Sequence, residues 1–186
     1  METLAGAMSS YLESEQPITS FRNEVRRAVN DAFTMAFYAG WADASPSVEE
    51  VPEDAIAWLT GRIEEEIGFA DTLFQDLKQL RKDMETEGSE YAEGWIAARA
   101  EGYTGTLDAI FAEGKLWGDK EQFLTWREGP TSDKCETCVW LDGQRHPASW
   151  FIENGYIPQS PGSETDCHGY NCLCFLENDD GDQIVP

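Results

Sequence analysis

The chain has 186 residues, with 36 acidic side chains against 13 basic ones, a formal net charge of −23 and a hydrophobic content of 41%. This hydrophobic content is typical of globular proteins and argues against a wholly disordered chain. The basic residues form no cluster, which disfavours a protein that binds nucleic acid through its phosphates. No apolar run approaches the length of about 18 residues that spans a membrane.

The acidity has two explanations. Dense carboxylates keep a protein surface hydrated in a halophilic host, where high salt screens their mutual repulsion. Alternatively, the acidic surface faces a basic partner. The scarcity of lysine and the even spread of acidic residues favour the halophilic host.

The chain begins Met1-Glu2-Thr3-Leu4, without a basic leader or a long apolar stretch. We therefore expect no secretion signal and residence in a reducing cytoplasm. A short helix is predicted over residues 3–12. An amphipathic helix is predicted from Phe21 to near Gly40, with Ser20 as its N-cap.

The longest regular pattern starts at residue 47 or 50 and ends at Met84, and its apolar residues recur at threes and fours. It predicts a helix of roughly 45 to 50 Å, whose apolar seam needs another helix to cover it. A turn over residues 86–89 leads into a third helix from Ser89. The alternative is that this third helix breaks near Gly102.

The last third predicts short elements. A strand is expected over residues 123–126, a hairpin over residues 139–146 with its turn at Asp142-Gly143, and a helical turn over residues 147–152. A closing strand over residues 172–176 is expected to pair with the first strand. The acidic end, residues 177–186, is expected to fray.

These elements predict a mainly α fold, a helical hairpin or bundle with one long helix, followed by a small C-terminal α+β module of the zinc-ribbon type. We expect a helical domain over residues 1–118 and a cysteine-rich, zinc-binding β-hairpin module over residues 119–177. The acidic tail then covers residues 178–186.

All the cysteines of the chain lie in that module: Cys135, Cys138, Cys167, Cys172 and Cys174. A Cys-x-x-Cys with further thiols about thirty residues later is typical of a structural Zn²⁺ site. Disulfides are an alternative, although five is an odd number and the expected compartment is reducing. Separate buried thiols are another. Four of the five thiols suffice as ligands, and His146 or His168 can replace one.

No catalytic residues stand out. A thiol oxidoreductase places its Cys-x-x-Cys within a βαβ pattern, and none precedes Cys135. No P-loop and no nucleophile-elbow serine occurs, and the carboxylates are too evenly spread to single out a pair. The sequence therefore predicts a binding protein that is not an enzyme and that has structural Zn²⁺ as its cofactor.

Two segments resemble the head-morphogenesis, or minor head (minor capsid), proteins of tailed phages. The weaker one is similar to the family's helix with an A-R-T-E core and a downstream tryptophan: Ile96-Ala-Ala-Arg-Ala-Glu101 and Lys115-Leu-Trp117. The more specific one is similar to the family's C-terminal cysteine pattern: Cys135-Glu-Thr-Cys138, Leu141-Asp-Gly143, Gly155-Tyr-Ile-Pro-Gln159 and Cys172-Leu-Cys174. Many relatives have histidine where this chain has Gly169, and Cys167 is the residue that can take over its role as a ligand.

The resemblance covers about residues 90 to 177. It implies a structural virion protein, made in the host cytoplasm, that binds capsid, portal or neck subunits during head assembly and is multimeric in the particle. Together with the acidity, it indicates a tailed virus of a haloarchaeon. The alternatives are a cellular zinc-ribbon adaptor and, less favoured, a Cys-x-x-Cys thiol oxidoreductase. We expect no sequence-specific nucleic acid and no membrane as partners.

Overall fold

The structure is a computed structural model. It describes residues 8–9, 11–12, 17–47, 50–87, 90–131, 134–160, 162–169 and 172–185. The chain is mainly helical with a small four-stranded antiparallel sheet, which confirms the predicted fold class at this level. It divides into two compact units, Met1–Thr34 with Ala57–Gly105 and Met35–Ile56 with Thr106–Pro186. Three helices contribute residues to both units, and the predicted boundary at residue 118 stays a prediction.

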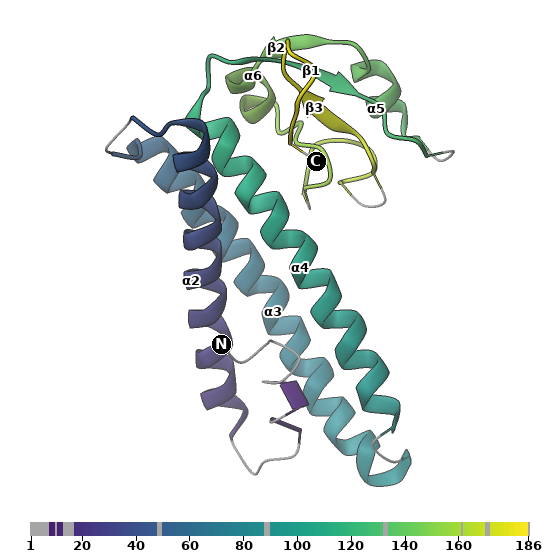
Figure 1. Ribbon diagram of the computed structural model, residues 1–186. Helices are drawn as coiled ribbons and strands as arrows, with labels where there is room; N and C mark the ends of the chain where they lie inside the picture. Colours follow the sequence, from purple (N-terminus) through teal and green to yellow (C-terminus); the bar gives the residue numbers. More distant parts are fainter. Residues whose placement is uncertain are drawn as a thin grey trace. The chain divides into compact units, whose positions relative to one another are not determined.

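These helices are α2 (Ile18–Ala44), α3 (Glu53–Glu87) and α4 (Glu90–Gly118) (Figure 1). The long helix predicted from apolar periodicity is confirmed as α3, and α4 continues through Gly102 without a break. The predicted N-cap at Ser20 is wrong, because the Pro17 carbonyl already accepts the Ser20 amide at 3.0 Å and α2 starts at Ile18.

Some predicted features fall on the undescribed positions. Residues 8–9 and 11–12 are helical, and the rest of the short helix predicted over residues 3–12 lies outside the described residues. The end of the predicted turn, residues 88–89, also lies outside them. None of the helices in the described ranges combines the length and apolar character of a membrane span.

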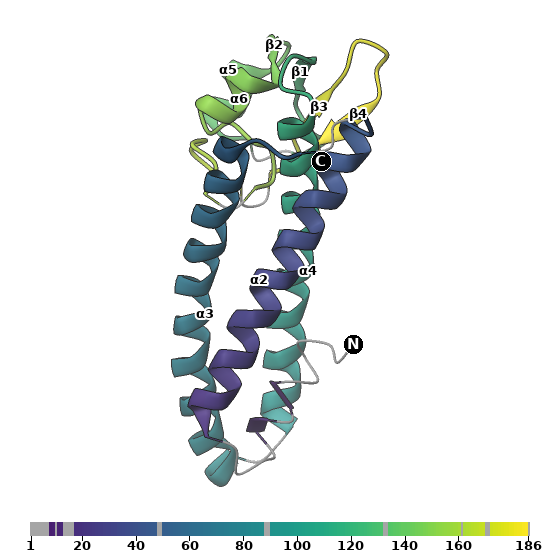
Figure 2. The ribbon, with the colours of Figure 1, turned by 90° about the vertical axis from the view of Figure 1, so that its left-hand side faces the viewer.

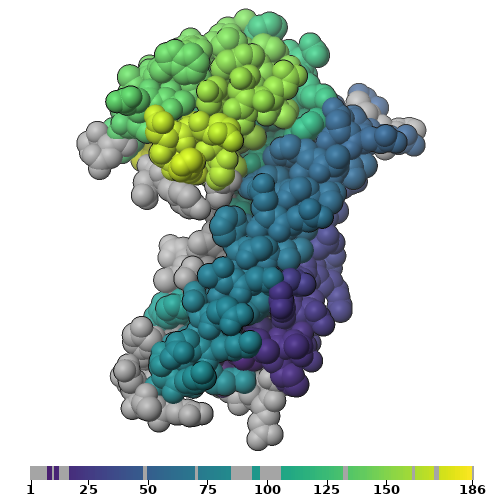
Figure 3. Space-filling model, turned by 180° about the vertical axis from the view of Figure 1, so that it is seen from behind, coloured from purple at the N-terminus to yellow at the C-terminus, as the bar shows by residue number. Residues whose placement is uncertain are grey.

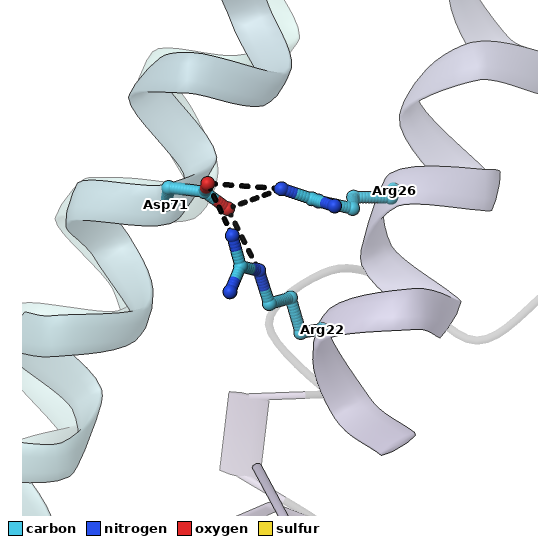
Figure 4. Close-up of polar contacts among 3 residues, drawn as sticks. All are labelled: Arg22, Arg26 and Asp71. Atoms are coloured by element: carbon cyan, nitrogen blue, oxygen red, sulfur yellow. Dashed lines mark hydrogen bonds and ion pairs between the residues drawn. The ribbon is translucent and has the colours of Figure 1, made fainter. Parts of the chain in front are cut away.

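In the first unit, aromatic and ionic contacts join α2 to α3. Phe21 stacks on Tyr11 with ring centroids 4.8 Å apart and meets Phe74 edge-on at 5.7 Å. Asp71 of α3 accepts hydrogen bonds at 2.9 Å from Arg22 Nε and Arg26 Nη2 (Figure 4). Desolvation alone would raise the pKa of Asp71, but these hydrogen bonds lower it below its usual value.

In the second unit, α2 and α4 approach backbone to backbone, and Figures 1 and 2 both show their ends side by side. A Cβ added at Gly40 would lie 1.9 Å from the Phe111 carbonyl oxygen, and one at Gly114 would lie 2.2 Å from the Phe37 carbonyl oxygen. No side chain fits at these distances, so the crossing depends on glycine in both helices.

The sheet of the second unit has the order β2-β1-β3-β4. Its central strands are β1 (Phe123–Arg127) and β3 (Phe175–Glu177), with β2 (Arg145–Pro147) and β4 (Gln183–Val185) at the edges. Two short helices, α5 (Glu136–Leu141) and α6 (Ala148–Glu153), accompany them. The core between these elements is apolar and fully buried: Leu124, Trp126, Leu141, Phe151, Leu176 and Val185.

The structure confirms three predicted elements of this region. Residues 123–126 form a strand, it pairs antiparallel with the closing strand, and a helical turn follows Pro147. Trp126 lies opposite Leu176 in this pairing. The closing strand starts at Phe175, so Cys172 and Cys174 precede it rather than lie in it.

Two predictions for this region are wrong. Residues 139–141 are helical, because Cys135 caps α5, so only residues 145 and 146 of the predicted hairpin lie in a strand. The acidic end does not fray. The Asn178 side chain accepts the amides of Asp180 and Asp182, and this turn lets β4 pair with β3 and bury Val185. Figure 3 shows the yellow C-terminal segment packed against the green residues of the same unit.

The helix crossing generates a prediction. Gly40→Ala should lower the free energy of unfolding by roughly 1–3 kcal/mol, because the new methyl group forces the α2 and α4 backbones apart. Gly61→Ala is the matched control, since a Cβ at Gly61 meets nothing within 4 Å. The control should stabilise the helix by about 0.5–1 kcal/mol. Urea unfolding followed by circular dichroism measures both, and equal effects would contradict the close approach.

Candidate metal centre

Two of the five thiols come from the start of α5. Cys135 is the N-cap of this helix, and its sulfur accepts a hydrogen bond from the Cys138 amide at 3.4 Å. The two sulfurs are thereby held on the same side of the first turn. Cys138 is buried, whereas Cys135 is partly exposed.

The second pair, Cys172 and Cys174, lies just before a central strand of the sheet. Both residues directly precede β3, and the pairing of β3 with β1 fixes where they lie. The amide of Cys174 donates to the sulfur of Cys172, so this pair also has a backbone amide directed at one sulfur. Both thiols are buried.

The fifth thiol, Cys167, comes from a loop with two left-handed residues, His168 (φ 49°) and Gly169 (φ 77°). Asp166 joins this loop to α5, because its carboxylate accepts from both the amide and the hydroxyl of Thr137, at 3.0 and 2.7 Å. These hydrogen bonds lower the pKa of Asp166 and place Cys167 beside the start of α5. The sequence pattern gives no signal for the Thr137–Asp166 contact.

The sulfurs form two groups that share one member. The sulfurs of Cys135, Cys138 and Cys167 lie within 4.8 Å of one another, and so do those of Cys138, Cys172 and Cys174. The Cys138 and Cys172 sulfurs are 3.7 Å apart. The structure therefore brings together all five predicted thiols, and the cluster can hold a metal ion; which of them act as ligands stays a prediction.

The two histidines do not belong to these groups in the described part of the chain. His146 stacks on Trp150 with ring centroids 3.8 Å apart, and its Nε2 lies 3.2 Å from the Gln144 side-chain oxygen. His168 places Nδ1 3.3 Å from the Ser163 carbonyl oxygen. The donor set that the structure assembles is therefore sulfur alone.

The separations fit a metal–thiolate centre. In a tetrahedron with metal–sulfur bonds of about 2.3 Å, neighbouring sulfurs lie about 3.8 Å apart. The distance between Cys138 and Cys172 already matches this edge. Within each group of three, the other sulfurs lie no more than 4.8 Å apart, so small side-chain movements bring them to this edge.

Burial and hydrogen bonds shift the pKa values of four of the thiols in different directions. A hydrogen bond from Cys172 lowers the pKa of Cys174 to about 6, and the same bond raises the pKa of Cys172. Burial raises the pKa of Cys138. At Cys167, burial would raise the pKa, but hydrogen bonds from Thr165 and the Gly169 amide lower it. A bound cation would stabilise the thiolate form at each ligand, so binding releases protons.

Two glycines make room for the cluster. A Cβ at Gly129 would lie 1.9 Å from the Leu173 carbonyl oxygen, and the Gly129 amide donates to the sulfur of Cys174. A Cβ at Gly169 would lie 2.1 Å from the Ser160 carbonyl oxygen, so no side chain fits at this position. The sequence signals Gly129 only through the Gly-Pro turn with Pro130.

Comparison of the chain with protein-family models, with curated proteins and with solved structures found no match. The resemblance to head-morphogenesis proteins therefore rests on the residues quoted above and stays a prediction.

The position of Gly129 generates a prediction. Gly129→Ala should push the 172–174 segment away from α5 and withdraw the amide from Cys174, and so weaken metal binding by at least about tenfold. Competition with a chromophoric chelator measures this affinity. Gly61→Ala is the control, since neither glycine has a positive φ and a Cβ at Gly61 meets nothing within 4 Å. Equal affinities for the two variants would show that Gly129 does not position the cluster.

Proposed function

We propose that this protein is a structural component of a tailed-virus particle, of the minor head or head-morphogenesis type. A Zn²⁺ ion holds its C-terminal module together, and the protein binds capsid, portal or neck subunits during head assembly. The observation that carries this proposal is the convergence of five thiols from three separate segments of one small module.

A structural role for the ion follows from the size of the module. Three of its strands have only three residues each, and both of its helices have six. The apolar core between elements this short is small, and modules of this size commonly draw folding free energy from a bound metal. Four thiolates fill a tetrahedral coordination sphere, so no position is left for a substrate or an activated water.

Zinc suits the donor set best. Thiolate ligands select zinc, monovalent copper or iron–sulfur clusters over hard cations such as Mg²⁺ and Ca²⁺. The Cys138–Cys172 distance of 3.7 Å supports a four-sulfur tetrahedron around a single ion. Zinc also needs no redox partner to remain bound in a reducing cytoplasm.

The surface of the module supports a binding role. Trp140 of α5 is 57% exposed, although tryptophan is usually largely buried. Exposed tryptophans of this kind are favoured as anchors in protein–protein contacts. The virion assignment itself draws on the cysteine pattern and the acidity described above. A cellular zinc-ribbon adaptor would use the same surface and is the second candidate.

The first prediction concerns the ion. Cys138→Ser should reduce bound zinc from about one ion per chain to near zero, because Cys138 belongs to both sulfur groups. The module should then lose its near-ultraviolet circular dichroism, while most of the far-ultraviolet helical signal remains. Val139→Ser is the matched control, since the neighbouring side chain is exposed and should leave zinc content unchanged. Full zinc content in Cys138→Ser would contradict the proposed centre.

The second prediction concerns the particle. The protein should co-sediment with gradient-purified virus particles at a fixed copy number. Particles assembled with only the Cys138→Ser variant should lack it. Immunoblotting and quantitative mass spectrometry of the particle fractions measure both. A protein found only in the soluble host fraction would support the cellular adaptor instead.

A further inference from the structure

The cluster contains one more thiol than a tetrahedral ion needs, and the five differ in burial. Three of them, Cys138, Cys172 and Cys174, are at most 8% exposed and lie within 4.8 Å of one another. The other two, Cys135 and Cys167, are partly exposed. We call these the inner triad and the outer pair.

The two outer sulfurs both lie close to the same inner sulfur, that of Cys138. Cys135 and Cys167 each lie within 4.8 Å of Cys138 and of each other. If the inner triad supplies three ligands to a tetrahedral ion, one coordination position is left for two thiols. Both outer thiols are partly exposed, and both lie within 4.8 Å of the Cys138 sulfur.

Each outer thiol is held by its own support. Cys135 caps α5 and accepts the Cys138 amide, whereas the sulfur of Cys167 lies 3.3 Å from the Thr165 hydroxyl. The Thr137–Asp166 hydrogen bonds hold the Cys167 loop against α5 whichever sulfur is used. Loss of one outer thiol should therefore leave the other in place.

We propose that Cys135 and Cys167 are alternative fourth ligands of one ion held by the inner triad, and that hydrogen peroxide joins these two sulfurs in a disulfide that opens the centre. This inference rests on the proposed metal site. It identifies the oxidation site of the cluster as its outer pair.

The oxidation balances with peroxide as the oxidant. One outer thiolate attacks a peroxide oxygen, the O–O bond breaks, and a sulfenic acid and hydroxide form. The second outer thiolate attacks the sulfenic sulfur, the S–S bond forms and a second hydroxide leaves. Two electrons pass from the sulfurs to peroxide, and the two hydroxides take up two protons to become water. Both candidates for the fourth position are then consumed together.

Burial explains why the outer pair reacts first. Peroxide must reach a sulfur from solvent, and the inner sulfurs are almost fully covered. Cys138 and Cys172 are close at 3.7 Å, but both are buried. The partly exposed thiol that is not bound to the ion at a given moment is the accessible nucleophile.

Serine variants of the purified full-length protein test the shared position. Cys135→Ser and Cys167→Ser should each retain about one zinc ion, whereas the double variant should lose it to a chelator that leaves the wild type loaded. The visible spectrum of the Co²⁺-loaded protein supplies a second readout. Both single variants should show four-thiolate coordination, and the double variant should not.

Two results separate failure of this inference from failure of the metal site. If only one of the two single variants loses the ion, the ligand set is fixed and the alternation is wrong. If the wild type itself binds no ion, the metal site and this inference both fall. Val139→Ser is the control for the effect of introducing a hydroxyl group elsewhere on α5.

Peroxide treatment tests the disulfide. The zinc-loaded wild type should release its ion while it loses two of its five thiols and the mass of two hydrogen atoms. Peptide mapping should link the peptide containing Cys135 to the peptide containing Cys167. Either single variant should keep its ion under the same treatment, since it has no outer pair. Release that is equally fast from the single variants, or a link between inner thiols, would overturn the proposal.

Discussion

The second unit of this protein is organised around one constraint, the meeting of five sulfurs at Cys138. Three segments deliver them: the start of α5, the loop before residue 169 and the chain just before β3. Each segment is held by contacts of its own, so the sulfurs are placed by the fold as well as by any ion. The short strands and six-residue helices also enclose a small apolar core, in which Trp126 and Phe151 are fully buried.

Close backbone approach is the second recurring device. In the module, Gly129 and Gly169 lie against the carbonyl oxygens of Leu173 and Ser160, and in the helices Gly40 and Gly114 lie against those of Phe111 and Phe37. In each case the missing side chain lets two backbones meet at a distance that alanine would forbid. Gly40 and Gly114, which are unfavourable by helix propensity, are therefore required by packing, whereas Gly61 is not.

The few basic residues of this acidic chain serve mainly as links between segments. Arg145 of β2 binds Asp179 of the β3–β4 turn, Arg127 binds Glu177 across β1 and β3, and Lys120 binds Asp54. Each pair is at least partly exposed and therefore weak alone.

Local patterns in the sequence determined the long helices, the central strand and the candidate thiols, because apolar periodicity and Cys-x-x-Cys spacing act over a few residues. The tertiary structure decided the rest. Residues 139–141 became helical through the Cys135 cap, the tail became β4 through the Asn178 turn, and Asp166 met Thr137 across 29 residues. The tertiary structure also decided that Cys138 belongs to both sulfur groups. Distances between residues far apart in sequence depend on the whole fold rather than on local propensity.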